Sequence, residues 1–419
     1  MDGEATAGLD PVVAEALRAA FEGEWARVVA TLIRVTGDWD VAEDAAAGAF
    51  ERAALTWPRD GVPHNPGAWL TTAARNLALN RLRRRGVEAD KLQALGTMER
   101  TSGREPADPA DLALSEPELD DRLRLIFTCA HPALPLDARV ALTLRTVGGL
   151  STPEVARAFL VKESAMAQRI VRAKAKIANS AIPYRVPPPE ALPERLAGVL
   201  AVLYLIYNEG YAASSGEQLQ RLDLAAEAIR LTRLVVGLLP DGEAVGLLSL
   251  MLLQHARAAA RVDADGDLVP LEEQDRSRWD AYEIAEGLAL LHAATGDYGP
   301  YRVQAEIQGV HACARVASET DWRAILALYN LLPESPIVEL NRAIALGMAE
   351  GPESGLAALA SLAASGRLAG YHLLPAAQAD LHRRAGLLDA AATHYRAAIA
   401  LASTVPERRY LERRLAALA

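Results

Sequence analysis

The sequence predicts an all-α protein, and three observations lead to this fold class. Apolar residues recur at i, i+3, i+4 and i+7 along most of the 419 residues, whereas the alternating pattern of strands is almost absent. Stretches rich in turn-forming residues at 57–67, 103–117 and 183–193 separate the helical segments. With 51% hydrophobic residues, the chain can bury the cores of two or three domains. We therefore expect two small helical domains joined by an acidic linker and followed by a long helical C-terminal domain.

The first domain is expected to cover residues 10–86. Asp38 precedes an amphipathic stretch and is a typical N-cap residue, because its carboxylate can accept hydrogen bonds from the free amides of a first helical turn. Gly86 follows a basic helical stretch and is expected to end it as a C-cap. The predicted elements are helices at 12–35, 38–55 and 68–85 and a loop at 57–67.

An acidic linker is expected over 87–119, where helical periodicity is lost, and the second domain over 120–180. Ser151 and Glu154 have the spacing of a capping box. The two short helices that follow, the second of them basic, are typical of a helix-turn-helix. The predicted helices of this domain are 120–130, 137–147, 152–159 and 163–178.

A Pro-rich connector is expected over 181–194 and a helical domain over 195–419. Its helices pair through short loops and carry small residues at close-packing positions, which favours a tetratricopeptide-like (TPR-like) α-solenoid. The consensus of that repeat, about 34 residues long, is not cleanly repeated, so a compact irregular bundle remains the alternative. The clearest helices are 321–332, 336–347 and 389–401.

The formal net charge of −10 argues against a nucleic-acid-binding protein, because such domains are usually basic. The charge is unevenly distributed, however: residues 1–185 hold 24 basic and 25 acidic residues, whereas 186–419 carry a net charge of −9. Basic residues concentrate at 75–85 and 137–178, and such islands can bind phosphate because charges act over only about 10 Å at physiological salt. We expect the acidic tail to avoid DNA and to contact the chain's own basic helices.

Both basic islands are candidate DNA-binding surfaces. On helix 68–85, Trp69 can stack on an unpaired base and Asn76 can read a base edge, although a helical tryptophan is commonly a core residue. In the helix-turn-helix, the second helix would place its first side chains at base edges and its later Arg and Lys side chains at phosphates. The positions expected to be exposed on that helix are Lys162, Ser164, Gln168, Arg169, Arg172, Lys174 and Lys176.

No enzyme or metal constellation is present in the sequence, so we expect no catalytic residue, no metal and no cofactor. The chain lacks a Gly-rich phosphate loop, a His-Glu-x-x-His pair and a Cys-x-x-Cys pair. The acids between Asp263 and Asp267 resemble a calcium loop, but Gln274 stands at the twelfth position, where such loops have Glu. Two isolated cysteines, no signal peptide and no apolar run of about 18 residues favour a cytoplasmic protein without membrane contact.

One segment of the tail, YLIYNEGY at 204–211, concentrates aromatic and polar side chains. It could line a ligand pocket or form a seam between helices, and the sequence leaves both open. The pocket candidates are Tyr204, Tyr207, Asn208, Glu209 and Tyr211.

The order of these parts resembles that of extracytoplasmic-function (ECF) sigma factors, the compact bacterial transcription initiation factors. The promoter-melting domain is matched by VAEDAAAGAFERAALTWPRDGVPHNPGAWL (41–70) and TTAARNLALNRLRRR (71–85). Residues 121–178 look like the domain that binds the minus-35 element. The tail resembles a subgroup with a long TPR-like extension through the stretches 204–231, 265–280 and 367–386.

This resemblance implies binding to the core RNA polymerase, through its β′ clamp and β flap, and to promoter DNA. It implies that the loop 57–67 holds a flipped base, that the linker mimics RNA in the exit path, and that the tail is a fused regulator. The implied polymerase-binding residues are Glu43, Asp44, Phe50 and Glu51. The implied DNA-binding residues are Arg75, Asn76, Asn80, Arg81, Arg83 and Arg84 near the minus-ten element, and Gln168, Arg169 and Arg172 at the minus-35 element.

The sequence departs from this family at one place on the polymerase-binding helix. Where the family has a bulky residue followed by Gln-Glu, this chain has Ala46, Ala47 and Gly48. Asn80 also stands where Asp is common. The alternative function is therefore a repurposed sigma-like protein with weakened polymerase binding, whose helical tail binds a small molecule or a protein partner, with catalysis in a biosynthetic pathway as a further option.

Overall fold

The computed structural model describes residues 11–94, 121–159, 161–180, 182–212, 219–294 and 298–418. Within these ranges the chain is built from helices, and the β-contacts there amount to an isolated bridge between Val262 and Leu268. The predicted all-α class is confirmed. The chain divides into two compact units, Met1–Val202 and Leu203–Ala419, which are described separately below.

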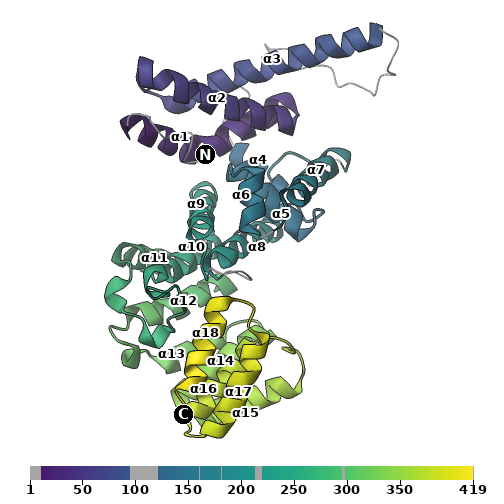
Figure 1. The fold of residues 1–419 in the computed structure, drawn as a ribbon. Helices are drawn as coiled ribbons and strands as arrows, with labels where there is room; N and C mark the ends of the chain where they lie inside the picture. Colours follow the sequence, from purple (N-terminus) through teal and green to yellow (C-terminus); the bar gives the residue numbers. More distant parts are fainter. Residues whose placement is uncertain are drawn as a thin grey trace. The chain divides into compact units, whose positions relative to one another are not determined.

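Three long helices open the first unit (Figure 1): α1 (Pro11–Thr36), α2 (Trp39–Asp60) and α3 (Pro66–Ala94). Asp38 caps α2 as predicted, since its Oδ1 accepts a hydrogen bond of 2.9 Å from the amide of Val41. Aromatic rings join α1 to α2: Phe21 and Phe50 meet edge to face, with their centroids 5.2 Å apart. Such ring pairs add specificity to the burial of apolar surface.

Helix α2 is longer than predicted. It continues through Trp57 and Pro58 to Asp60, whereas the sequence predicted an end at Leu55 and a loop from 57. Trp57 is 1% exposed and packs edge to face on Trp69 of α3, with ring centroids 5.8 Å apart. Burial of this large ring stabilises one more turn of helix and offsets the cost of a proline there.

Helix α3 is also longer than predicted, because it runs past Gly86 to Ala94. Gly86 is therefore not a C-cap, and the first part of the predicted linker 87–119 is helical. The remaining residues of that linker, 95–119, lie outside the described residues.

The second half of the first unit contains α4 (Asp121–Cys129), α5 (Leu136–Leu142), α6 (Thr152–Ala158) and α7 (Glu163–Asn179). The predicted capping box is confirmed: the amide of Ser151 donates to Glu154 Oε2 at 2.6 Å, and the amide of Glu154 donates to Ser151 Oγ. Although burial acts in the opposite direction, these hydrogen bonds hold the pKa of Glu154 below its usual value.

The predicted single helix over 137–147 is divided in two. It leaves the α-helical form after Leu142 and continues as a π-helical turn, η1 (Thr143–Val147), closed by the hydrogen bond from the Gly148 amide to the Thr143 carbonyl. Gly149 follows with a φ of +78°. A Cβ atom at this glycine would lie 2.8 Å from the ring of Phe21, so the close approach of α1 to this turn requires glycine here.

The Pro-rich connector is fixed to the first unit through Tyr184. Its hydroxyl donates to the carbonyl of Ala30 at 2.9 Å, and its ring meets Trp39 edge to face. Burial raises the pKa of Tyr184, which therefore remains a neutral donor at physiological pH. Helix α8 (Leu192–Tyr211) then begins inside the predicted connector, and the division between the two units falls within it.

The second unit begins with helices packed around α10 (Gly242–His255), which is buried on most of its sides. Its neighbours are α9 (Leu222–Leu238), α11 (Ala281–Ala293) and α12 (Pro300–Cys313). Because α10 is surrounded, its sequence (GEAVGLLSLMLLQH) is apolar over nearly its whole length rather than amphipathic. Short 3-10 turns link these helices: η2 (Ala258–Ala260), η3 (Leu271–Glu273), η4 (Arg276–Arg278) and η5 (Ala317–Glu319).

The rest of the second unit is a row of helices in which each contacts the next along the chain. They are α13 (Trp322–Tyr329), α14 (Pro336–Glu350), α15 (Pro352–Ala364), α16 (Leu373–Arg384), α17 (Leu388–Leu401) and α18 (Val405–Ala416). The predicted helices at 321–332, 336–347 and 389–401 correspond to α13, α14 and α17. The tail thus combines a bundle around α10 with sequential helix pairs, and the TPR-like description stays a prediction.

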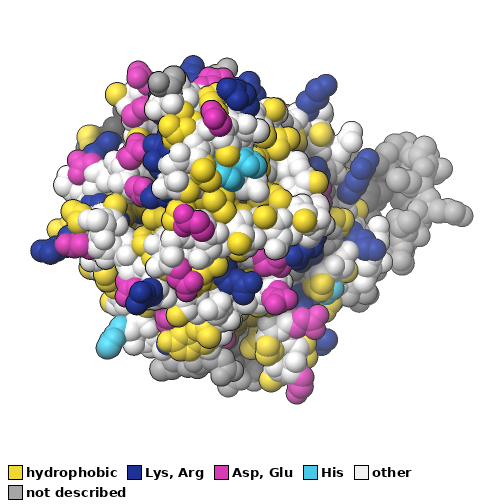
Figure 2. All heavy atoms as spheres, turned by 90° about the horizontal axis from the view of Figure 1, so that it is seen from below, with side chains coloured by type: hydrophobic (Ala, Val, Ile, Leu, Met, Phe, Trp, Pro, Cys, Tyr) yellow, Lys and Arg dark blue, Asp and Glu magenta, His cyan; other side chains and the backbone are white. Residues whose placement is uncertain are grey.

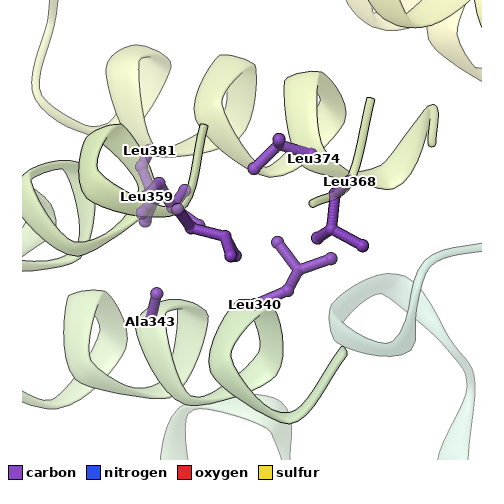
Figure 3. Packing of buried hydrophobic residues seen from close by; sticks show 7 residues of the cluster. Leu340, Ala343, Leu359, Leu368, Leu374 and Leu381 are labelled. Atoms are coloured by element: carbon purple, nitrogen blue, oxygen red, sulfur yellow. The ribbon is translucent and has the colours of Figure 1, made fainter. Parts of the chain in front are cut away.

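Leucine side chains from α14, α15 and α16 form the core of this row (Figure 3). Leu340, Leu359 and Leu381 are each about 1% exposed or less and point toward one another between the helices. Gly355 allows α15 to approach α14, since a Cβ atom there would lie 2.8 Å from the carbonyl oxygen of Ala343. Tight packing of this kind is sensitive to the removal of even a few methyl groups.

The substitution Leu359→Ala should lower the free energy of unfolding of the second unit by about 2–5 kcal/mol, because it removes buried methyl groups and leaves a cavity. Urea unfolding followed by circular dichroism measures this change. The control Leu331→Ala removes a leucine that is 61% exposed and should change stability by less than about 0.5 kcal/mol. Equal losses for the two variants would contradict the packing described here.

Candidate nucleic-acid and polymerase interface

Helix α7 presents one apolar face and one polar face. Met166, Ile170 and Ile177 are buried against the rest of the domain. The opposite face is exposed and carries polar and basic side chains with a spacing of about one helical turn. The predicted residues on this exposed face are Lys162, Ser164, Gln168, Arg172 and Lys176. Five of the seven positions expected to be exposed on α7 are therefore exposed.

A hollow of about 630 Å³ lies along this face, between α7 and the start of α5, and Gln168, Arg172 and Lys176 line it. Val171, which helical periodicity did not single out, also lies on the exposed side of the helix and is 64% exposed. An exposed apolar side chain between Gln168 and Arg172 is suited to contact a thymine methyl group in a major groove. In the sequence, the position of Val171 among the polar residues of this helix face was the signal that could have predicted its exposure.

Two basic residues of α7 are already engaged within the domain. Arg169 Nε lies 3.0 Å from Asp137 Oδ2, so its guanidinium is half-buried beside α5. The side chain of Lys174 is 13% exposed, and its Nζ lies 2.8 Å from Asp40 Oδ1 and 3.1 Å from Glu43 Oε1. The expectation that Lys174 is exposed is therefore wrong, because a buried carboxylate on α2 draws it inward.

The second basic island lies on α3. Asn76, Asn80, Arg83 and Arg84 are exposed, whereas Arg75 is half-buried. Arg81 is exposed but forms an ion pair of 3.0 Å with Asp44 of α2. Four polar or basic side chains of this island, those of Asn76, Asn80, Arg83 and Arg84, are therefore exposed to solvent.

Trp69 is half-buried against Trp57 in the packing of α2 on α3. This packing fits the core role that the sequence left open for Trp69, and its stacking on a base stays a prediction.

A buried carboxylate joins the two halves of the first unit. Glu43 is 3% exposed. Its Oε1 accepts a hydrogen bond of 2.9 Å from Thr146 Oγ1, and its Oε2 lies 3.2 Å from Arg145. Together with Lys174 at 3.1 Å, two cations and one hydroxyl compensate a charge that would be costly to bury alone.

Further contacts surround this cluster. Trp25 Nε1 donates to the carbonyl of Thr146 at 3.1 Å, and Arg34 Nε donates to Asp121 Oδ2 at 2.9 Å. Both contacts join α1 to the second half of the unit. Because the residues of these pairs are more than 80 positions apart in sequence, no local pattern could have predicted them.

The implied polymerase-binding residues divide into two groups. Asp44 and Glu51 are exposed on α2. Phe50 is 3% exposed and lies against Phe21 and Trp25, and Glu43 is buried in the cluster just described. The expectation that Glu43 and Phe50 lie on a free surface is therefore wrong for this structure, because both side chains are part of its interior.

The short residues at 46–48 also have a packing role. Ala46 is fully buried, and a Cβ atom at Gly48 would lie 3.2 Å from Leu77 Cδ1 of α3. A side chain at Gly48 would require Leu77 to shift, and a larger side chain at the buried Ala46 would overpack the interior. The departure from the family pattern thus accompanies a close α2–α3 contact.

The five pocket candidates in the tail form part of a seam between helices. Tyr207 is fully buried and its hydroxyl donates to the carbonyl of Met251 at 3.0 Å, which corresponds to the seam that the sequence left open as one of two roles. Tyr211 stacks on Tyr207, and Tyr204 donates to Gln304 Oε1 at 3.3 Å. Asn208 and Glu209 are half-buried on the same helix.

The surface of the molecule seen in Figure 2 carries Lys and Arg side chains interspersed with Asp and Glu, without a large region of one sign. The face in this view therefore lacks the basic stripe that is typical of a DNA-binding surface. Within the described ranges, none of the helices is both long enough and apolar enough to cross a bilayer, and no group of three or more His, Cys, Asp or Glu residues has the arrangement of a metal site.

Comparison with known proteins found two family matches, and they include the helices α3 and α7 whose exposed faces were described above. Residues 24–87 match the family Sigma-70 region 2, and residues 124–177 match Sigma-70, region 4. The chain therefore belongs to the sigma-70 family, and these regions imply binding to the RNA polymerase core and to promoter DNA. The match includes α2, α3 and α7, where the exposed basic side chains lie.

Two further comparisons concern the whole chain and the tail. The "Uncharacterized protein R00370" of Rhizobium meliloti (strain 1021) is 42% identical over 401 residues, which cover 94% of this chain and 93% of that protein. Residues 195–295 match a "Family of unknown function (DUF6596)". No solved structure matches the chain.

The substitution Lys174→Gln should destabilise the first unit by about 1–3 kcal/mol, because it leaves the buried carboxylate of Glu43 with one cation instead of two. Urea unfolding followed by tryptophan fluorescence reports on this unit, since Trp25 lies beside the same cluster. The control Lys176→Gln, an exposed lysine one half-turn away, should change stability by less than about 0.5 kcal/mol. If Lys174→Gln has no larger effect than Lys176→Gln, the cluster does not stabilise the unit.

Proposed function

We propose that this protein is an RNA polymerase sigma factor of the ECF type, in which regions 2 and 4 direct promoter-specific transcription initiation and the helical tail is a fused regulatory module. The observation that carries this proposal is the exposed polar face of α7, with Ser164, Gln168 and Arg172 at successive turns, in a chain that matches both sigma-70 regions. A helix of this kind reads base edges and phosphates from a major groove.

In this proposal, the side chains that contact the β′ clamp from α2 are Asp44 and Glu51, because both are exposed. Glu43 instead serves the contact between the two halves of the first unit. On α3, Asn76, Asn80, Arg83 and Arg84 face the promoter near its minus-ten element, and their exposure supports this role.

Purified full-length protein should co-elute with core RNA polymerase and support run-off transcription from its promoter. Absence of any binding to the core at low salt would contradict the sigma-factor proposal and would favour the repurposed sigma-like alternative. The control is the same chain with Asp44 and Glu51 both replaced by Ala, which should bind the core more weakly.

The substitution Arg172→Ala should weaken promoter binding and reduce the slope of log affinity against log salt by about 1, because one phosphate contact is lost. Fluorescence anisotropy with a labelled promoter duplex over a range of salt concentrations measures both quantities. The control Arg278→Ala removes an exposed arginine of the tail and should leave the slope unchanged. Equal slopes for wild type and Arg172→Ala would place Arg172 outside the DNA contact.

A further inference from the structure

Three guanidinium groups of the tail lie close together in the second unit. Arg257 is 8% exposed and Arg261 is 9% exposed, and the third, Arg276, is half-buried. Within the described residues none of the three forms an ion pair, whereas Arg384 and Arg414 nearby are both paired with acids. Burying cationic groups without a counter-charge is costly.

Neutral groups bind these cations instead. Arg257 Nη2 donates to the hydroxyl of Tyr211 at 2.9 Å and to Gln308 Oε1 at 3.1 Å, while its buried Nε has no partner. Arg261 donates to the carbonyl of Tyr211 and lies 3.6 Å above that tyrosine ring. These contacts orient the guanidinium groups. The carboxylates that act on them, Glu407 on Arg261 and Glu319 on Arg276, do so from beyond ion-pair distance.

Arg276 is held in a fixed position with donors to spare. Its Nη1 donates to the carbonyls of His311 and Ala314 at the end of α12, and its guanidinium stacks on Trp279 at 4.6 Å from the ring centroid. Its Nε and Nη2 make no hydrogen bond within the described residues. A stacked and anchored guanidinium with free donors is suited to bind a carboxylate or a phosphate.

A cavity of about 580 Å³ opens beside Arg276, which is the size of a small-molecule site. His311 lines it, is 7% exposed, and its Nδ1 is buried without a hydrogen-bond partner. Burial and the positive charges of Arg257 and Arg276 lower the pKa of His311 to about 4. The imidazole is therefore neutral at physiological pH and lies in a positive electrostatic field.

The opposite wall of the cavity differs in character. Arg384 and Arg414 are shared between Asp380 and the rim carboxylates of Glu272 and Glu273, so that wall holds two cations against three carboxylates and has no free positive charge. Apolar surface is supplied by Trp322, Met348 and Tyr410. The cavity thus has one positive end and an apolar body.

We propose that this cavity binds a small organic anion, with its carboxylate or phosphate group at Arg276 and His311 and its apolar body against Trp322 and Met348. The site lies in the tail and goes beyond the proposed role of the chain in transcription. The site involves none of the residues placed at the DNA or polymerase surfaces. A negative result for anion binding therefore leaves the sigma-factor proposal intact, and the reverse also holds.

The test uses the full-length protein with benzoate and phenyl phosphate as probes and neutral benzamide as their matched control. Isothermal titration should give dissociation constants of about 1 mM for one or both anions and at least tenfold weaker binding of benzamide. The order of the two anions tells whether a carboxylate or a phosphate is the better fit. Absence of binding by both anions up to about 10 mM, or equal binding of benzamide, would overturn the proposal.

Variants and a second measurement locate the site. Arg276→Gln should weaken anion binding at least tenfold, whereas Arg278→Gln, on the same 3-10 turn but outside the cavity, should bind like the wild type. Equal binding by wild type and Arg276→Gln would overturn the proposal.

Because Arg276 also holds the end of α12, a readout without mutation is needed as well. In the unaltered protein, the anion should shift the proton NMR signal of the His311 ring and leave that of the exposed His64 unchanged. A His311 signal that stays in place while the anion binds would overturn the proposed location.

Discussion

The first unit depends on a single buried charge. The carboxylate of Glu43 lies in the interior, and its burial is tolerable only because Arg145, Thr146 and Lys174 reach it from the other half of the unit. Removing one partner of such a cluster leaves an uncompensated charge, so the cluster constrains how α2, η1 and α7 pack. Around it, Trp25 donates a hydrogen bond to the Thr146 carbonyl, and Gly149, which has no Cβ atom, leaves space for the ring of Phe21. The same constraint decides which basic side chains of α7 remain free for another partner.

Helix α7 shows how packing selects from a basic sequence. Its periodicity separates buried Met166 and Ile170 from exposed Gln168 and Arg172, and the sequence predicts this division because helical geometry alone produces it. The periodicity says nothing about Lys174, which is drawn toward an acid more than 130 positions away. The surface of α7 that is available to DNA is therefore smaller than the number of basic residues in this helix suggests.

The second unit also contains buried charged groups, and among them are cations that no ion pair compensates among the described residues. Residues 186–419 carry a net charge of −9, yet the second unit gathers Arg257, Arg261 and Arg276, and none of these three forms an ion pair with another described residue. Net charge describes the exterior of a domain, whereas an unbalanced interior points to a ligand. The aromatic segment at 204–211 packs against two of these cations, since Tyr211 contacts both Arg257 and Arg261.

The sequence by itself determined the helices, the capping box of Ser151, the two basic islands and the resemblance to sigma factors, because each follows from local periodicity, local hydrogen bonding or short motifs. It misplaced the ends of α2 and α3, where burial of Trp57 on Trp69 extends one helix and Gly86 fails to end the other. Tertiary structure alone decided that Glu43 and Tyr207 are interior residues and that His311 faces a cavity beside unpaired arginines. These features arise from contacts between distant parts of the chain, whose energies depend on burial and on neighbouring charges that no local pattern records.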